Sequence, residues 1–91
     1  MEIHSVSLKI DAEHIVRSLR DAAEKIGDAG GELILDFSAV SRIDTPAVGA
    51  IEKLAGVAGE KAVKVTLQGV NVDVYKVLKL VRLVPRFSFA T

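Results

Sequence analysis

Hydrophobic and polar residues alternate at the start of the chain and then recur with helical spacing. Residues 3–10 alternate, so a strand over them would have one apolar and one polar side. From residue 12 to residue 26 the apolar positions recur every three or four residues, and Gly27 follows them. The pattern therefore predicts a half-buried β-strand followed by an amphipathic helix capped by Asp11.

The next segment repeats this strand-helix order with a more buried strand. Residues 33–37 carry apolar side chains on both faces, which is typical of a central strand with parallel neighbours. A second helix is expected to open at Asp44 or Thr45, because Pro46 suits the first helical position, where no backbone N–H is needed. Gly59 is expected to end this helix.

The last third of the chain follows the same order again. Residues 62–68 alternate between apolar and polar side chains, which predicts a third strand with one polar face. Asn71 is a good cap for a third helix, which Pro85 would stop. The alternating tail 86–89 predicts one short final strand.

This order of elements predicts an α/β fold with about four mainly parallel strands joined by right-handed crossovers. If the apolar positions of the strands face the helices, the opposite sheet face is largely polar, with Ile34 as its apolar exception. A fold with helices on both faces would cover that face with apolar contacts. We therefore expect all three helices to pack on one face of the sheet.

The length, charge and composition of the chain limit its number of domains, its classes of partner and its location. Ninety-one residues make one domain over residues 1–91. Twelve basic residues balance twelve acidic ones, without the basic excess typical of nucleic-acid binding. The chain has no cysteine, which favours an intracellular location, and charged residues interrupt every apolar run before the roughly 20 residues that a membrane span needs. We expect a cytoplasmic protein that does not span a membrane.

Candidate binding residues cluster where the predicted strands end, because the carboxyl ends of parallel strands meet at one edge of a sheet. Asp11, the stretch 38–45 and the stretch 69–71 should lie there, with Asp11, Thr45 and Asn71 capping their helices. Helix N-termini attract negative charge, so an anion or a partner's carboxylate could bind at this edge. No metal site is expected, since His4 and His14 lie in different elements without further ligands at metal spacing.

The centre of this edge resembles a known family. The strand LILDFS (residues 33–38), followed by SRIDTPAVG (residues 41–49), resembles the signature of STAS domains, in which Leu-Val-Leu-Asp-Leu-Ser precedes Asp-Ser-Ser-Gly-Leu-Gly. YKVLKLVRL (residues 75–83) resembles that family's third helix. The resemblance implies the fold of anti-sigma factor antagonists and a non-enzymatic, cofactor-free role in bacterial signalling to transcription, through protein–protein interaction.

The chain departs from the family pattern at positions that matter for regulation. In antagonists of this type the second Ser of Asp-Ser-Ser-Gly is phosphorylated by an anti-sigma kinase, and here that position is Pro46, which has no hydroxyl. The resemblance therefore implies a module that is not switched by phosphorylation at the usual position. Thr45 aligns with the first Ser and is the remaining candidate phosphorylation site. Ala47 replaces the motif glycine, and Arg82 replaces a glycine of the third helix.

Two partner classes stay open. The first is an anti-sigma factor or serine kinase-like protein. The second is an ABC transporter ATPase or permease, because Asp44-Thr45 also resembles the Asp-Thr of the small cytoplasmic STAS subunit in phospholipid-transporting ABC complexes. A homodimer through the polar sheet face is a further alternative, as is a stressosome-like scaffold. The residues expected to bind or regulate the partner are Ser41, Asp44, Thr45, Pro46, Ala47 and Asn71.

Overall fold

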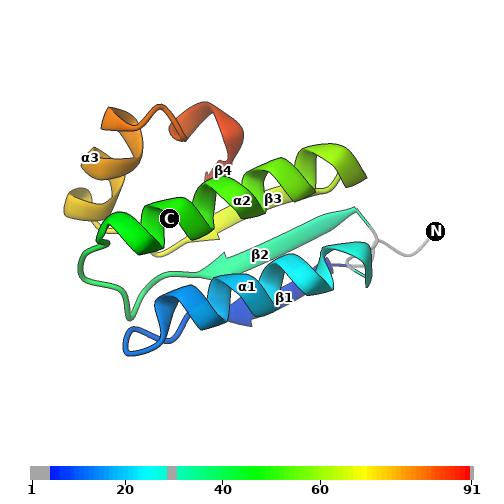
Figure 1. The fold of residues 1–91 in the computed structure, drawn as a ribbon, viewed down its shortest axis with the longest axis horizontal. Coiled ribbons are helices and arrows are strands. Elements are labelled where there is room, and N and C mark those ends of the chain that lie inside the picture. Colours follow the sequence, from blue (N-terminus) through cyan, green and yellow to red (C-terminus); the bar gives the residue numbers. More distant parts are fainter. Residues whose placement is uncertain (1–4, 29–30, 91) are drawn as a thin grey trace.

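A computed structural model describes residues 5–28 and 31–90, and it has the alternating order of strands and helices that the sequence predicts. Ile3 and His4, the first two residues of the predicted strand 3–10, lie outside these ranges. The elements are β1 (Ser5–Lys9), α1 (Ile15–Lys25), β2 (Glu32–Asp36), α2 (Thr45–Lys61), β3 (Lys64–Gln68), α3 (Val72–Leu80) and β4 (Ser88–Ala90), with 3-10 turns at Ile26–Asp28 and Val84–Arg86. Figure 1 shows α1 and α2 side by side across the sheet.

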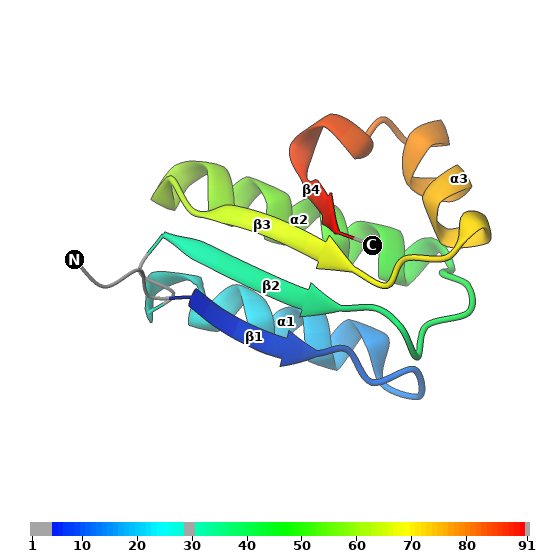
Figure 2. The same ribbon diagram turned by 180° about the vertical axis from the view of Figure 1, so that it is seen from behind.

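The four strands form one sheet in the order β1-β2-β3-β4, and every neighbouring pair is parallel. Each crossover carries a helix, as parallel strands require. Figure 2 shows the face of the sheet that α1 and α2 leave uncovered. On the covered face, the ring of Tyr75 from α3 lies edge-on against Phe89 of β4 with 5.3 Å between their centroids, so α3 packs on the same side. The α/β fold with helices on one face is confirmed.

The core lies between the sheet and the helices. Leu33 and Leu35 of β2 are fully buried. Their register partners on β3, Val65 and Leu67, have exposed fractions of 3% and 1%. The helices contribute apolar side chains at helical spacing, including Leu19, Ile51, Leu54, Val74 and Leu78. On the uncovered face Ser7, Lys9, Lys64 and Gln68 are exposed. The predicted division into an apolar and a polar face is therefore correct.

The first helix starts later than predicted because Asp11 forms a turn of its own. Its carboxylate accepts the N–H of Glu13 at 2.9 Å and its carbonyl accepts the N–H of His14 at 3.1 Å. These bonds hold residues 11–14 in an Asx turn, which competes with helical backbone. The helix begins at Ile15, with His14 as its N-cap and without a side-chain capping bond. The predicted capping of this helix by Asp11 is wrong.

The other helix ends are set by backbone conformation. The second helix runs past Gly59 to Lys61, and Ala62 then adopts a left-handed conformation at φ 55°. The third helix ends in the same way, with Arg82 at φ 62°. There the N–H of Leu83 reaches the carbonyl of Leu78 at 2.8 Å, which completes a Schellman motif. The last strand is shifted to 88–90, because Arg86 belongs to a 3-10 turn that contains Pro85.

Candidate functional site

The loops that follow β2 and β3 lie against each other at the carboxyl edge of the sheet. The N–H of Phe37 donates to the carbonyl of Gln68 at 2.7 Å, which extends the strand pairing beyond β2. Gly69 then passes so close to Ser38 that a β-carbon at Gly69 would lie 3.0 Å from the Ser38 β-carbon. The φ of 72° at Gly69 also favours glycine. The predicted meeting of these loops is confirmed.

Asn71 ties the two loops together with its side chain. Its Oδ1 accepts the N–H of Val74 at 2.8 Å, so Asn71 is the N-cap of α3 as predicted. Its Nδ2 donates to the carbonyl oxygen of Ser41 at 2.9 Å and lies 3.4 Å from that of Val40. One amide therefore fixes both the start of α3 and the path of the chain into α2.

Asp44, and not Thr45, caps the second helix. Asp44 has extended backbone, and its Oδ1 accepts the N–H of Ala47 at 3.0 Å, while its carbonyl accepts the N–H of Val48 at 2.9 Å. Thr45 is the first helical residue and Pro46 follows it. The expectation that Thr45 is the cap is wrong, because Asp44, one residue earlier, has the extended backbone of an N-cap and its carboxylate accepts the N–H of Ala47. The Thr45 hydroxyl lies outside the capping bond.

The capping of α2 by Asp44 argues against the expected binding of an anion at the start of this helix. A helix N-terminus binds anions through free N–H groups. Here Pro46 has no N–H and that of Ala47 is bonded to Asp44, which leaves the N–H of Thr45 beside a carboxylate. The residues at this position can offer hydroxyl, carboxylate and apolar groups to a protein surface more readily than they can hold a free anion.

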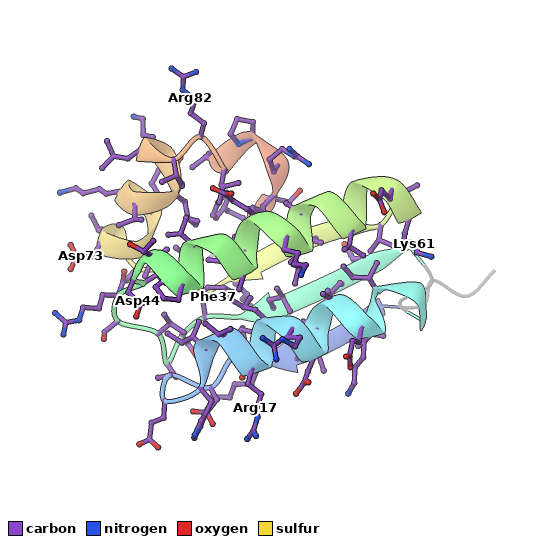
Figure 3. The ribbon with its side chains drawn as sticks, viewed as in Figure 1. Arg17, Phe37, Asp44, Lys61, Asp73 and Arg82 are labelled. Atoms are coloured by element: carbon purple, nitrogen blue, oxygen red, sulfur yellow. The ribbon has the colours of Figure 1, made fainter. Side chains whose placement is uncertain are left out.

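Most of the candidate residues are accessible. Ser41, Asp44, Thr45, Pro46 and Asn71 are all exposed. Ala47 is 1% exposed, so its side chain belongs to the core and is not available to a partner. Figure 3 shows Asp44 at the start of α2, with Phe37 at the same end of the helix pair. We refer to the exposed residues Ser41, Asp44, Thr45, Pro46 and Asn71 as the loop edge.

Two aspartates beside the loop edge are held as carboxylates by local hydrogen bonds. The hydroxyl and the N–H of Ser38, the latter at 2.8 Å, lower the pKa of Asp36, and Lys9 on the neighbouring strand adds to this. The N–H of Glu13 and then the ring of His14, at 3.3 Å from Oδ2, lower the pKa of Asp11. Both carboxylates therefore stabilise turns and are poorly suited to act as general bases near neutral pH.

The surface beside the loop edge is hollowed between the start of α1 and the loop that leads into α2. A hollow of about 500 Å³ is lined by Ala12, Ile15, Ser41, Arg42, Ile43 and Asp44. It combines apolar side chains with one cation and one carboxylate, a mixture typical of protein-binding surfaces. Over residues 5–28 and 31–90, no three metal-ligating side chains lie close enough together to hold an ion, and no helix is long and apolar enough to cross a bilayer.

A second hollow lies between α1 and α2 and reaches the loop edge at Pro46. It has a volume of about 460 Å³ and is lined mainly by small or aliphatic side chains, among them Val16, Ala23, Gly49 and Ala50, together with the charged side chains of Arg20, Glu24 and Lys53. A β-carbon at Gly49 would meet no atom within 4 Å, so the groove is open at that point. The sequence pattern did not predict this groove.

The comparisons with known proteins point to one family and one fold. The family model described as "STAS domain" matches residues 3–91. The crystal structure of a Thermotoga maritima protein described as an anti-sigma factor antagonist superposes with a TM-score of 0.68 at 21% sequence identity, covering 100% of this chain and 76% of that chain. No curated protein sequence matches the chain. The structural likeness at this identity shows the fold.

Proposed function

The chain belongs to the STAS domain family, and on that premise we propose that it is a non-enzymatic regulatory module that binds another protein through the loop edge. The single observation that carries this proposal is an exposed polar surface whose loops are joined by side-chain hydrogen bonds. Asn71 fixes the α3 start to the loop before α2, and Asp44 fixes the first turn of α2. A surface held in one conformation loses little entropy on binding.

An enzymatic function has little support in the residues of the loop edge. Its only carboxylate, Asp44, is engaged as a helix cap, and the neighbouring hydroxyl of Thr45 has no adjacent base to activate it. The nearby carboxylates are held in their ionised form by hydrogen bonds, which come from the hydroxyl and N–H of Ser38 for Asp36 and from the N–H of Glu13 and the ring of His14 for Asp11. Recognition of a partner's surface needs none of these groups to change protonation state.

Regulation in this proposal does not use the position at which antagonists are phosphorylated. That position is Pro46, which is exposed and has no hydroxyl. The adjacent Thr45 is exposed and its hydroxyl is not used for capping, so it is the residue at which an added phosphate would change the loop edge. Such a phosphate would stand beside the Asp44 carboxylate and meet repulsion there.

Asp44-Thr45 also supports a second candidate, a small cytoplasmic subunit of a phospholipid-transporting ABC complex. In this alternative the same loop edge binds the transporter's ATPase or permease. The observation that favours it is the pair itself, a capping aspartate followed by an exposed threonine hydroxyl. The identity of the bound protein separates the two candidates.

The proposal is tested by affinity purification from native lysate with the wild-type chain and Thr45→Glu, followed by mass spectrometry. Ser7→Glu serves as the matched control, because Ser7 is exposed on the uncovered sheet face. We expect one partner to be captured by the wild type and by Ser7→Glu and lost with Thr45→Glu. A kinase-like protein favours the anti-sigma antagonist role and an ABC ATPase or permease favours the transport role. Equal capture by both glutamate variants contradicts binding through the loop edge.

A further inference from the structure

The large hydrophobic side chains that are exposed in the described part of the chain are concentrated in one short segment. They are Val72, Tyr75, Leu80 and Val81, with exposed fractions of 68%, 40%, 83% and 37%. All of them belong to α3 or directly follow it. Single exposed apolar residues are normal on a protein surface, but a cluster on one element indicates an interaction site.

Basic side chains share this surface. Lys76, Lys79 and Arg82 are exposed, and Asp73 is the one acidic residue between Val72 and Arg82. Helical spacing places residues 72, 73, 76, 79 and 80 on the side of α3 opposite its buried residues Val74 and Leu78, so the acidic Asp73 lies beside the two lysines there. The helix therefore presents aliphatic and cationic groups together, away from the core.

The last cation of this surface is held in an unfavourable backbone conformation. Arg82 has a φ of 62°, in the left-handed region that is unfavourable for a residue other than glycine. Figure 3 shows its side chain projecting away from the body of the molecule beyond the end of α3. Glycine would satisfy the same Schellman motif without strain. A strained residue in a turn closed by two backbone hydrogen bonds is a reason to look for a role of its side chain.

An apolar hollow adjoins the other end of the helix. It has a volume of about 290 Å³ and is lined by Gly69, Val70, Asn71, Val72, Tyr75, Phe89 and Ala90. The edge-on packing of Tyr75 on Phe89 fixes its wall. This hollow could receive one apolar side chain, and Asn71 makes it continuous with the loop edge. We refer to Val72, Tyr75, Lys76, Lys79, Leu80 and Arg82 as the α3 face.

We infer that the α3 face, together with this hollow, docks an amphipathic helix of the partner protein that carries Asp or Glu residues beside its apolar ones. Its carboxylates would pair with Lys76, Lys79 and Arg82, while an apolar residue enters the hollow between Val72 and Tyr75. This inference rests on the proposed function, because it describes the chemistry of the same partner. Complementary charge steers association and sets the register of docking.

A protein fits this surface better than an anionic membrane does. Lipid-binding clusters usually contain about 4–8 basic residues, whereas the α3 face has Lys76, Lys79 and Arg82, with the acidic Asp73 next to it. Tyr75 is packed against Phe89 and is therefore not free to insert into a bilayer. The nine-residue helix is also attached to the core by Val74 and Leu78.

The test uses the full chain and a phage-displayed library of random 16-residue peptides. Peptides selected on the wild type are synthesised, and their affinities are measured by fluorescence anisotropy. We expect selected peptides to place Asp or Glu one helical turn from apolar residues and to bind Lys76→Glu/Lys79→Glu about tenfold or more weakly. Leu80→Ser should also weaken them. Lys53→Glu/Lys61→Glu is the matched charge control on α2, where both lysines are exposed, and should bind as the wild type does.

Each other outcome overturns the inference. Peptides without acidic residues, peptides that bind both double variants equally, or the absence of any selected peptide would exclude an acidic helix as the occupant. Selected peptides whose affinity falls with Thr45→Glu but with no α3 variant would show that they bind the loop edge and not the α3 face. Sedimentation with phosphatidylglycerol–phosphatidylcholine vesicles that carries down the wild type but not Lys76→Glu/Lys79→Glu would assign this face to lipid instead.

Discussion

The side-chain amide of Asn71 donates a hydrogen bond of 2.9 Å to the carbonyl oxygen of Ser41, which lies 30 residues earlier in the chain. The same residue caps α3 through the N–H of Val74 at 2.8 Å. One side chain therefore positions the loop before α2 relative to the start of α3. The exposed groups at the loop edge keep a fixed spacing because of this double role.

Replacing Asn71 should cost both stability and binding. Asn71→Ala removes the cap and the bond to Ser41, so we expect the free energy of unfolding to fall by about 1–3 kcal/mol in urea denaturation. Asn71→Asp keeps a side-chain oxygen that accepts the N–H of Val74, but it replaces the donating Nδ2 by a second oxygen that faces the carbonyl oxygens of Val40 and Ser41. This variant should lose the bond to Ser41 and bind a partner more weakly than the wild type. Wild-type stability in Asn71→Ala would contradict the role of this amide.

The second helix should depend on Asp44 and hardly on Thr45. Asp44→Ala removes the bond to the N–H of Ala47, and we expect a loss of about 1 kcal/mol. Asp44→Asn retains an acceptor and should lose less. Thr45→Ala should stay within about 0.5 kcal/mol of the wild type, because the hydroxyl is exposed and outside the cap. Urea denaturation measures all three, and a larger effect at Thr45 than at Asp44 would reverse the assignment.

Within residues 5–28 and 31–90, the two residues other than glycine with positive φ should be sites of stabilising substitution. Arg82 and Ala62 have φ values of 62° and 55°. Glycine relieves the strain but adds freedom to the unfolded chain, so Arg82→Gly and Ala62→Gly should each raise the free energy of unfolding by about 0.5–1 kcal/mol. Only Arg82→Gly should also weaken an acidic peptide bound at the α3 face. Destabilisation by Ala62→Gly would show that strain is not the dominant effect.

Stability should decline as the solution becomes acidic. Hydrogen bonds lower the pKa of Asp36 and Asp11 in the folded state, so both bind protons more readily when unfolded. Their contribution is present above the unfolded pKa, near 3.9 for Asp, and is lost as pH falls through the lower folded pKa. Asp36→Asn and Asp11→Asn should each make the fall of the melting temperature below about pH 4 less steep, as measured by thermal unfolding at a series of pH values. The exposed Glu52→Gln is a control, and equal flattening by it would contradict the assignment.

The periodic parts of the fold could be predicted because burial imposes its own spacing. Leu33 and Leu35 on β2, and Val65 and Leu67 on β3, recur at every second residue, which is the period of a strand, and are buried as expected. The helix starts were less certain, because adjacent polar residues compete. Asp44 and Thr45 are both good caps, and the sequence does not say which backbone conformation each adopts. Asp11 formed its own turn instead of a cap for the same reason.

Relationships between distant segments could not be predicted. The contact between Gly69 and Ser38 and the bond from Asn71 to Ser41 depend on how closely two loops approach, which no local pattern records. Ala47 was a candidate for partner binding because it lies in the motif, yet the turn of the helix points it into the core. The left-handed backbone at Arg82 could have been suspected, since the family has glycine at that place.

The most direct test of partner binding through the loop edge is site-specific photo-crosslinking. The chain contains no cysteine, so Thr45→Cys and Ser7→Cys can each be labelled uniquely with benzophenone maleimide. After irradiation in native lysate, the crosslinked protein is identified by mass spectrometry. We predict that label at position 45 captures a specific partner protein and that label at position 7, on the uncovered sheet face, does not. Capture of that partner from position 7 alone would contradict the account.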